Sequence, residues 1–232
     1  MTASPPQSPL KHRITNTHSK DPLFTAPRPA LAVDVVLFTI VDNNLKVGLV
    51  QRQENPYFGK FSLPGRMVRY DEPVETTAKI ALQQKANINP ESVFFEQLYT
   101  FGQDLHRDTR LRVVAIVYYG LVRAENIAES KIEWYSVYKL PLTAFDHKEI
   151  IEYAVQRLRK KVLESDFAFQ LMAEEFTLTE LQKAYEVILD KTLDKRNFRK
   201  KILELHILKP LRKKKMEGTH RPAELYEFVR KR

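Results

Sequence analysis

A row of basic and amide side chains near the C-terminal end of this 232-residue chain has the chemistry to bind DNA. The row fills residues 195–201 around one apolar position: Lys195, Arg196, Asn197, Arg199, Lys200 and Lys201. Arginine can donate two hydrogen bonds to O6 and N7 of guanine, and asparagine can pair in the same way with N6 and N7 of adenine. We therefore expect Arg196 and Asn197 to read base edges in a major groove, with Arg199 as the next candidate.

A second basic cluster follows a few residues later. It consists of Arg212, Lys213, Lys214 and Lys215, and then His220 and Arg221. We expect the four consecutive cations to contact phosphates, which adds affinity without sequence information, and the last two to enter a minor groove. Residues 177–232 carry sixteen Lys and Arg against eight Asp and Glu, or +8 of the formal charge of +9, so the rest of the chain is nearly neutral. Charge alone leaves three alternatives open: a solvated surface, a module used for dimerisation, or a scaffold whose basic tail binds RNA or acidic proteins.

The elements around these clusters predict a winged helix-turn-helix. Thr177 and Glu180 have the spacing of a capping box that opens one helix, and Asp194 can cap the next. The second helix has one apolar stripe: Phe198, Ile202 and Leu205. Residues 207–208 and 223–229, joined by a basic loop, supply a β-ribbon as the wing. Helix, short turn and cationic helix is the order of a DNA-binding motif.

The N-terminal part has the alternation of an α/β fold with a mixed sheet. The turn residues 42–44 separate two β-branched runs at 32–41 and 45–52, which predicts a hairpin. Helical spacing covers 72–86 and 147–162, and strand-like runs cover 94–101, 113–122 and 133–137. Residues 1–27 are rich in Pro, Ser and Thr and are expected to be a disordered tail. We expect a first domain over 28–162 and the winged helix over 163–232.

The segment 63–72 resembles the start of the Nudix signature, G-x5-E-x7-R-E-U-x-E-E-x-G-U, in which U is a bulky aliphatic residue. Aligned on Glu72, only Leu82 and Ile88 also fit; the other signature positions hold Arg66, Ile80, Ala81, Gln84, Lys85 and Asn87. Nudix chemistry needs several carboxylates on one helix to hold Mg²⁺, which activates water. The sequence therefore predicts no catalytic residues, no metal site and no hydrolysis by the usual route.

Over nearly all of residues 30–232 the chain resembles the Nudix-related transcriptional regulators of NAD metabolism, the NrtR-like family. The matching stretches are VDVVLFTIVDNNLKVGLVQR, YFGKFSLPG, QLYTFGQDLHRD, RVVAIVYYGLV, AFDH at 144–147, FTLTELQKAYEVIL, LDKRNFRKKILEL and HRPAELYEF. The resemblance implies a Nudix fold, with a mixed sheet sandwiched by helices, followed by the α+β winged helix. It also implies a homodimer on a palindromic operator. The best-known members repress NAD biosynthesis genes and leave DNA on binding ADP-ribose, whereas relatives respond to other metabolites and control sugar use.

The same resemblance implies a ligand pocket in the first domain. The loops 65–72 and 107–112 are expected to frame it, and its expected residues are Arg52, Phe58, Phe61, Arg66, Glu72, Tyr99, Phe101, Arg107 and Arg112. The planar guanidinium fork of arginine matches the oxygens of a diphosphate, and aromatic rings can stack on an adenine. Alternatively, Phe61 and Phe101 belong to the core and Arg107 pairs with Asp104 or Asp108.

The composition excludes several other classes of protein. The chain has no cysteine, which excludes disulfides and thiolate zinc sites, and its six histidines show no HxH or HExxH spacing. No apolar run approaches the roughly 20 residues that span a bilayer, and the N-terminal residues resemble no secretory signal. We expect a cytoplasmic, nucleoid-associated DNA-binding regulator, a repressor rather than an activator, that needs no cofactor and senses ADP-ribose or a related nucleotide. The alternatives are a sugar-metabolite-responsive regulator of the same architecture and an active Nudix ADP-ribose pyrophosphatase.

Overall fold

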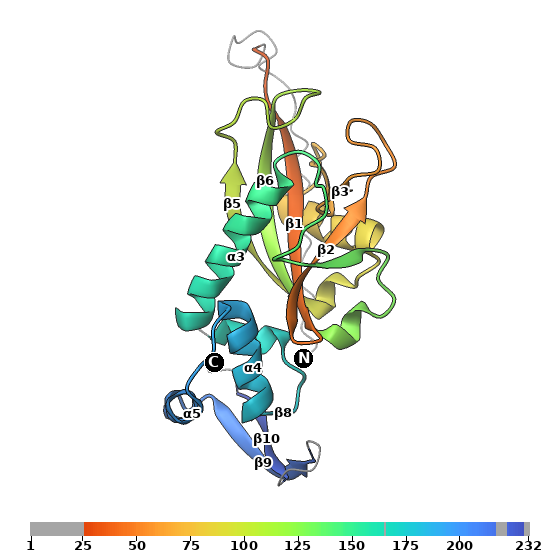
Figure 1. Ribbon diagram of the computed structural model, residues 1–232. Helices are drawn as coiled ribbons and strands as arrows, with labels where there is room; N and C mark the ends of the chain where they lie inside the picture. The colour runs from red at the N-terminus through yellow and green to blue at the C-terminus, as the bar shows by residue number, and fades with distance from the viewer. Residues whose placement is uncertain (1–25, 165, 217–221, 230–232) are drawn as a thin grey trace, which may run out of the picture.

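A mixed β-sheet with one helix on each face forms the larger part of the computed structural model, and a small helical unit with a β-ribbon forms one end (Figure 1). The structure describes residues 26–164, 166–216 and 222–229, so almost all of the predicted tail and the residues His220 and Arg221 lie outside it. No helix in these ranges combines the length and apolar character that crossing a membrane requires.

The large sheet joins seven strands in a mixed arrangement. Its strands are β1 (Ala30–Val41), β2 (Asn44–Gln51), β3 (Phe61–Ser62), β4 (Gly65–Met67), β5 (Val93–Phe101), β6 (Val113–Val122) and β7 (Glu133–Ser136). The order is β3-β2-β1-β6-β5, with β4 paired to β1 and β7 paired to β2. The β1–β6 pair is parallel and the other pairs are antiparallel, which confirms the predicted mixed sheet.

The predicted hairpin is confirmed, and its turn explains why these residues stand there. Asp42 and Asn43 both have positive φ, 53° and 52°. A two-residue turn of this kind matches the twist of the strands it joins, and Asp and Asn tolerate the left-handed conformation. The hairpin extends β1 and β2 to the end of the sheet that meets the small unit (Figure 1).

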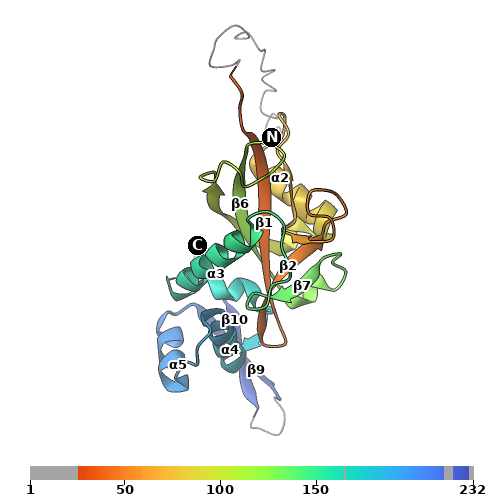
Figure 2. The same ribbon diagram turned by 45° about the horizontal axis from the view of Figure 1, so that its top comes forward.

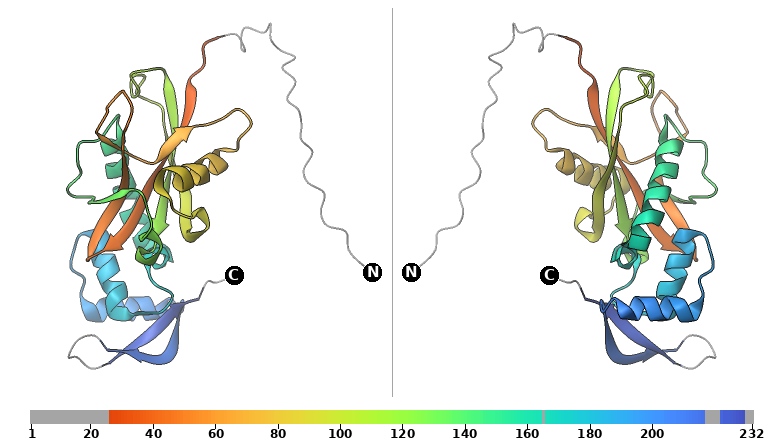
Figure 3. Two further views of the ribbon diagram at one scale, coloured as in Figure 1. Left: turned by 90° about the vertical axis from the view of Figure 1, so that its right-hand side faces the viewer. Right: turned by 90° about the vertical axis from the view of Figure 1, so that its left-hand side faces the viewer.

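Helices α2 (Val74–Ala81) and α3 (His147–Glu164) lie on opposite faces of the sheet (Figure 3). The predicted helix over 72–86 begins two residues later, after Pro73, and continues beyond α2 as a π-helical turn, Leu82–Ala86. Asn87, which stands where the Nudix signature has glycine, ends this turn with φ 53°. Asparagine is one of the few residues that replace glycine at a left-handed helix end. Short 3-10 turns cover Pro90–Ser92 and Ala124–Ile127.

The small unit has the helix-turn-helix and ribbon that the sequence predicts. After a 3-10 turn, Asp166–Leu171, it contains β8 (Phe176–Thr177), α4 (Leu178–Leu189), α5 (Lys195–Glu204), β9 (Leu208–Lys215) and β10 (Ala223–Phe228). The capping box is confirmed: Thr177 Oγ1 accepts from Glu180 N–H, and the Glu180 carboxylate accepts from Thr177 N–H. The three strands pair in the order β8-β10-β9.

Two details of the predicted winged helix were wrong. The cations at 212–215 belong to strand β9 rather than to a loop, because their backbone pairs with β10 around a bulge opposite Leu225. Arg212 stands in that bulge with φ 55°. Leu205 is half exposed and does not complete the apolar stripe, since α5 ends at Glu204 and only Phe198 and Ile202 are buried.

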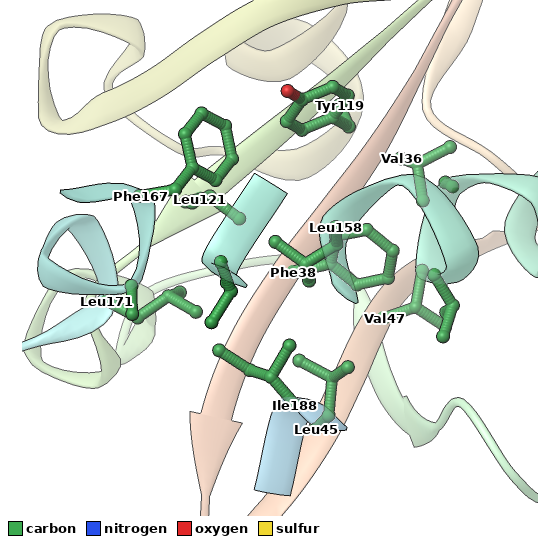
Figure 4. Packing of buried hydrophobic residues seen from close by; sticks show 14 of the residues in the cluster. Val36, Phe38, Leu45, Val47, Tyr119, Leu121, Leu158, Phe167, Leu171 and Ile188 are labelled. Atoms are coloured by element: carbon green, nitrogen blue, oxygen red, sulfur yellow. The ribbon is translucent and has the colours of Figure 1, made fainter. Parts of the chain in front are cut away.

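One hydrophobic core runs through both parts of the chain. Figure 4 shows Ile188 of α4 beside Leu45 of β2, near Phe38 of β1 and Leu158 of α3. On the other side of this core, Phe167 packs edge-on against Phe94 with ring centroids 5.0 Å apart. Residues on both sides of the predicted domain boundary, between 162 and 163, are buried in this one core. The core therefore does not separate two domains at this point, and the boundary stays a prediction.

Candidate functional site

The N-terminal half of α5 presents the predicted base-reading row to solvent. Lys195, Arg196, Asn197, Lys200 and Lys201 are all exposed. The opposite side of α5 is fixed by Phe198, whose ring packs edge-on against Tyr185 of α4 at 5.2 Å. The helix begins sharply because Asp194 Oδ1 accepts a hydrogen bond of 2.8 Å from Asn197 N–H. The two residues expected to read bases therefore lie at a capped, solvent-facing helix start.

The turn between α4 and α5 is held by side chains of α4. Gln182 donates to the Leu193 carbonyl at 2.9 Å, and Glu186 accepts from Leu193 N–H at 2.8 Å. Asp190 ends α4 in the left-handed conformation, with φ 54°. These contacts fix the direction of α5 relative to α4, which a recognition helix needs for its fit to a groove.

Arg199 has a different environment from the rest of the row. It is half-buried, and its Nη2 donates a long hydrogen bond of 3.4 Å to Thr179 Oγ1 of α4. Its Nε is buried and has no hydrogen-bond partner within the described ranges. The side chain braces α5 against the start of α4, so it is less available for a base than Arg196 or Asn197.

The four cations at 212–215 in strand β9 fall into two groups, one paired with acidic side chains and one not. Lys213 donates to Glu175, which precedes β8, and Lys215 donates to Glu180 of α4, each at 2.6 Å, so both contacts tie the ribbon to the segment that opens the small unit. Arg212 and Lys214 are exposed and form no ion pair within the part of the chain that the structure describes. Figure 2 shows β9 and α5 at the same end of the molecule, away from the large sheet.

A cavity of about 400 Å³ lies in the large domain, beside the strands β1 and β4. This volume is in the range of ligand pockets. Its basic residues are Arg52, Arg66, Lys85, Arg107 and Arg110, and its acidic residues are Asp34, Glu54 and Asp108. The excess of basic side chains favours an anionic ligand.

Three of the nine predicted ligand residues line this cavity: Arg52, Arg66 and Arg107. The other six lie outside its lining: Phe58, Phe61, Glu72, Tyr99, Phe101 and Arg112. Phe58 is 65% exposed, whereas Phe61 packs edge-on against Tyr135. Tyr99 and Phe101 form an aromatic cluster with Tyr153 of α3. Arg112 donates to the carbonyls of Gly102 and Asp104, so it holds its loop.

A buried network forms one wall of the cavity. Arg107, whose side chain is 4% exposed, donates from Nε and Nη2 to both carboxylate oxygens of Asp146, at 2.9 and 2.7 Å. Asp34 of β1 lies 3.7 Å from the same guanidinium. Burial lowers the pKa of Arg107, but its hydrogen bonds to Asp146 and the charge of Asp34 outweigh it and raise the pKa. The alternative pairing of Arg107 with Asp104 or Asp108 was wrong, because the ion pairs of Arg107 are with Asp146 and Asp34.

His147 completes the network at the start of α3. Its Nδ1 accepts a hydrogen bond of 2.9 Å from Leu63 N–H, and its Nε2 lies 3.8 Å from Asp34. Burial lowers the pKa of His147 despite the nearby carboxylates of Asp34 and Asp146. The imidazole is therefore neutral at pH 7, and its Nδ1 is the unprotonated nitrogen.

This environment predicts a pH-dependent stability. The folded chain binds the proton of His147 less readily than the unfolded chain does, so the free energy of unfolding falls as the pH drops below about 6.5, the ordinary value for histidine. We expect urea midpoints to fall between about pH 7.5 and 5.5, and to fall less in His147→Asn, which keeps an acceptor for Leu63 N–H. His106→Asn, at an exposed position, should behave as the unsubstituted chain. An equal fall in His147→Asn would contradict this assignment.

An aromatic residue in a strained conformation forms another wall. Phe145 has φ 53°, which is an outlier for an aromatic side chain. Its ring lies under two guanidinium groups, with Arg52 at 4.9 Å and Arg110 at 5.5 Å from the centroid. Arg110 also donates to both oxygens of Asp108; burial raises the pKa of this carboxyl, but the hydrogen bonds from Arg110 outweigh it and lower the pKa. Non-glycine residues with positive φ persist where their surroundings fix them, often at ligand sites.

Sequence reasoning did not place several residues in the cavity: Asp34, Lys85, Phe145 and His147. Asp34 had a visible signal, since it is the only charged residue in the apolar run 30–41. Phe145 and His147 belong to the AFDH stretch that matched the family. Lys85 was considered only as a lost metal ligand.

The family model for the NrtR DNA-binding winged helix domain matches residues 168–228. The ADPR responsive transcriptional repressor NtrR of Acinetobacter baylyi is 33% identical over 213 residues, covering 88% of this chain and 83% of that protein. An ADP-ribose pyrophosphatase of Methanocaldococcus jannaschii is 31% identical over 129 residues, covering 53% of this chain and 72% of that enzyme.

Solved structures of relatives match both the large sheet and the winged helix of this chain. The crystal structure of Shewanella oneidensis NrtR with a 27mer DNA is 36% identical, with a TM-score of 0.73 over 85% of this chain and 93% of that one. The Nudix domain of the same protein, crystallised with ADP ribose, is 37% identical, with a TM-score of 0.51 over 60% of this chain and 93% of that one. Since the likeness extends from the large sheet through the winged helix, the chain belongs to the NrtR family, whose members join a Nudix domain to a DNA-binding winged helix.

Proposed function

We propose that this chain is a transcriptional repressor that binds a palindromic operator as a homodimer and leaves it on binding ADP-ribose or a related nucleoside diphosphate. The observation that carries the proposal is the capped start of α5, where Arg196 and Asn197 are exposed at the same end of the molecule as the cationic strand β9 (Figure 2). The Acinetobacter relative is a repressor, and the Shewanella relative was crystallised on DNA. We propose in addition that the protein acts in the cytoplasm, associated with the nucleoid, where its operator lies.

The cavity supports a diphosphate as the effector. Its basic side chains include Arg52, Arg66 and Arg110, and guanidinium groups match phosphate oxygens in geometry as well as charge. The Acinetobacter repressor responds to ADP-ribose, and the Shewanella domain binds it. ADP-ribose is therefore the first effector to test, and the site residues lining the cavity are the first to vary.

Helix α3 connects the cavity to the winged helix. Its first residue, His147, lines the cavity, and Arg159 near its other end donates to the Ile188 carbonyl of α4 at 3.0 Å. Arg159 also lies 3.5 Å from Asp190, at the turn before α5. In the proposed mechanism, the ligand favours a dimer geometry in which the two copies of α5 no longer match half-sites one helical turn apart.

We also propose that the chain does not hydrolyse its ligand. Of the signature carboxylates only Glu72 remains, and its oxygens accept from Thr77 Oγ1 at 2.5 Å and from Arg66 Nη1 at 3.4 Å. The second candidate function is an ADP-ribose pyrophosphatase, which the likeness to the Methanocaldococcus enzyme favours. Incubation with Mg²⁺ and ADP-ribose separates the two: turnover near 1 s⁻¹, an ordinary enzymatic rate, would support the second.

Selection of operators from random DNA tests the proposed function directly. We expect the full chain to enrich one palindrome whose half-sites lie about 10 base pairs apart. The selection is repeated with ADP-ribose, NAD and sugar phosphates, and ADP-ribose should reduce the recovery of the palindrome. Release by sugar phosphates alone would favour the sugar-responsive alternative. Equal affinity for random duplexes and single strands would contradict the proposal and support an RNA-binding scaffold.

A further inference from the structure

The edge of the cavity next to α2 holds cations where a Nudix fold holds a divalent metal. Arg66 of β4 occupies the position of the first signature glycine, and Lys85 in the π-helical turn occupies that of a signature glutamate. Both side chains line the cavity. The Nudix fold implies Mg²⁺ at this edge, where the ion would need oxygen ligands.

The donor set does not fit Mg²⁺. This ion requires near-octahedral oxygen ligands, usually including carboxylates. The neighbouring signature positions hold Ile80, Ala81 and Gln84, which supply no carboxylate. Glu72 is already bonded to Arg66 and Thr77. Throughout the described ranges, no three His, Asp or Glu side chains lie close enough together to hold a metal ion.

The two cations at this edge keep donors for a ligand. Lys85 is exposed and forms no hydrogen bond or ion pair with any residue that the structure describes. Arg66 has 21% of its side chain exposed, and a single long contact of 3.4 Å joins it to Glu72. A guanidinium carries five N–H donors, so Arg66 has several left to donate. Glu72 holds the guanidinium at the cavity edge without saturating it.

We propose that Arg66 and Lys85 replace the divalent metal, so that this chain binds a nucleoside diphosphate without Mg²⁺. Arg66 donates to the phosphate oxygens through its planar fork, and Lys85 adds a point charge from the helix side. Fixed cations neutralise the diphosphate as a metal would, but they supply no metal-bound water to attack it. The substitution explains how one fold retains the ligand of an enzyme and loses the reaction. This inference rests on the proposed function, because it assigns the diphosphate part of the same site.

Titration calorimetry of the full chain tests the inference, with ADP-ribose and, separately, inorganic pyrophosphate as probes. Each titration is run in EDTA and again with Mg²⁺. We expect equal dissociation constants in both conditions, and a weakening of about tenfold in EDTA for Arg66→Ala. Lys85→Ala, at an exposed position that tolerates substitution, should weaken binding in the same direction. The matched control is Lys79→Ala, since Lys79 lies on α2 outside the cavity and pairs with Glu75 and Glu91.

A variant whose ligand binding should come to depend on Mg²⁺ provides the second readout. Gln84→Glu combined with Lys85→Glu returns carboxylates to two exposed positions, and its binding of ADP-ribose should become stronger when Mg²⁺ is added.

Binding by the unsubstituted chain only with Mg²⁺, or unchanged binding in Arg66→Ala and Lys85→Ala, would overturn the inference and leave the proposed function intact. Binding of pyrophosphate but not ADP-ribose in EDTA would support the inference and contradict the proposed effector. If neither probe bound in either condition, the inference would be overturned.

Discussion

Replacing Asp146 with alanine is expected to lower the free energy of unfolding by about 3–5 kcal/mol, the cost of leaving a buried charge without its partner. Arg107 donates two hydrogen bonds to this carboxylate from a side chain that is only 4% exposed. After the substitution, the guanidinium keeps Asp34 at 3.7 Å but loses its two hydrogen bonds to Asp146. Urea denaturation monitored by circular dichroism measures the change.

The matched control is Asp71→Ala. Asp71 is 81% exposed and lies 3.9 Å from Arg69, so it forms the same kind of ion pair on the surface. Exposed pairs contribute little, and we expect a change within about 0.5 kcal/mol. If Asp146→Ala changed the free energy of unfolding as little as the control does, the pair with Arg107 would not hold this part of the fold.

The elements that the sequence predicted correctly have local causes. The hairpin follows from Asp42 and Asn43, whose short polar side chains permit the two left-handed residues of the turn. The start of α4 follows from Thr177 and Glu180, which satisfy each other's backbone N–H groups within one turn. The start of α5 follows in the same way from Asp194. Each signal lies within four residues, so a reading of the chain alone can find it.

The features that sequence reasoning missed depend on residues far apart in the chain. Arg107 and Asp146 are 39 positions apart, and Leu63 and His147 are 84 apart. Nothing in local spacing says that the loop before β6 meets the start of α3. For this reason the alternative weighed for Arg107 named only neighbours in its own loop, and the contacts of Arg107 with Asp34 and Asp146 were not predicted.

The ribbon shows a third kind of difference. A run of four cations is typical of a solvated loop, and the sequence predicted one at 212–215. The run forms a strand because β10 supplies backbone partners and because Glu175 and Glu180 lie beside Lys213 and Lys215. The same contacts divide the cations into two that hold the ribbon and two, Arg212 and Lys214, that remain available to a ligand. The sequence alone treats the four as equivalent.

Arg196→Ala and Lys214→Ala should therefore weaken DNA binding in different ways. Loss of Arg196 is expected to reduce operator affinity by about 1–3 kcal/mol and to relax the base preference at one position, because a bidentate base contact is lost. Loss of Lys214 is expected to weaken all duplexes alike and to reduce the slope of log affinity against log salt by about one, because one phosphate contact releases its counterion. Fluorescence anisotropy with the selected operator and a scrambled duplex, over a series of salt concentrations, measures both effects.

Lys209→Ala is the control for a cation of the same strand that already has a partner. Lys209 donates to Glu227 of β10 at 2.6 Å, so its removal should change the salt slope less than that of Lys214. Lys213 and Lys215 are unsuitable for this comparison, since they also anchor the ribbon through Glu175, which precedes β8, and Glu180 of α4. If Arg196→Ala and Lys214→Ala reduced binding to both duplexes equally and with the same salt dependence, α5 would contact only the phosphate backbone. Base recognition would then have to come from other residues.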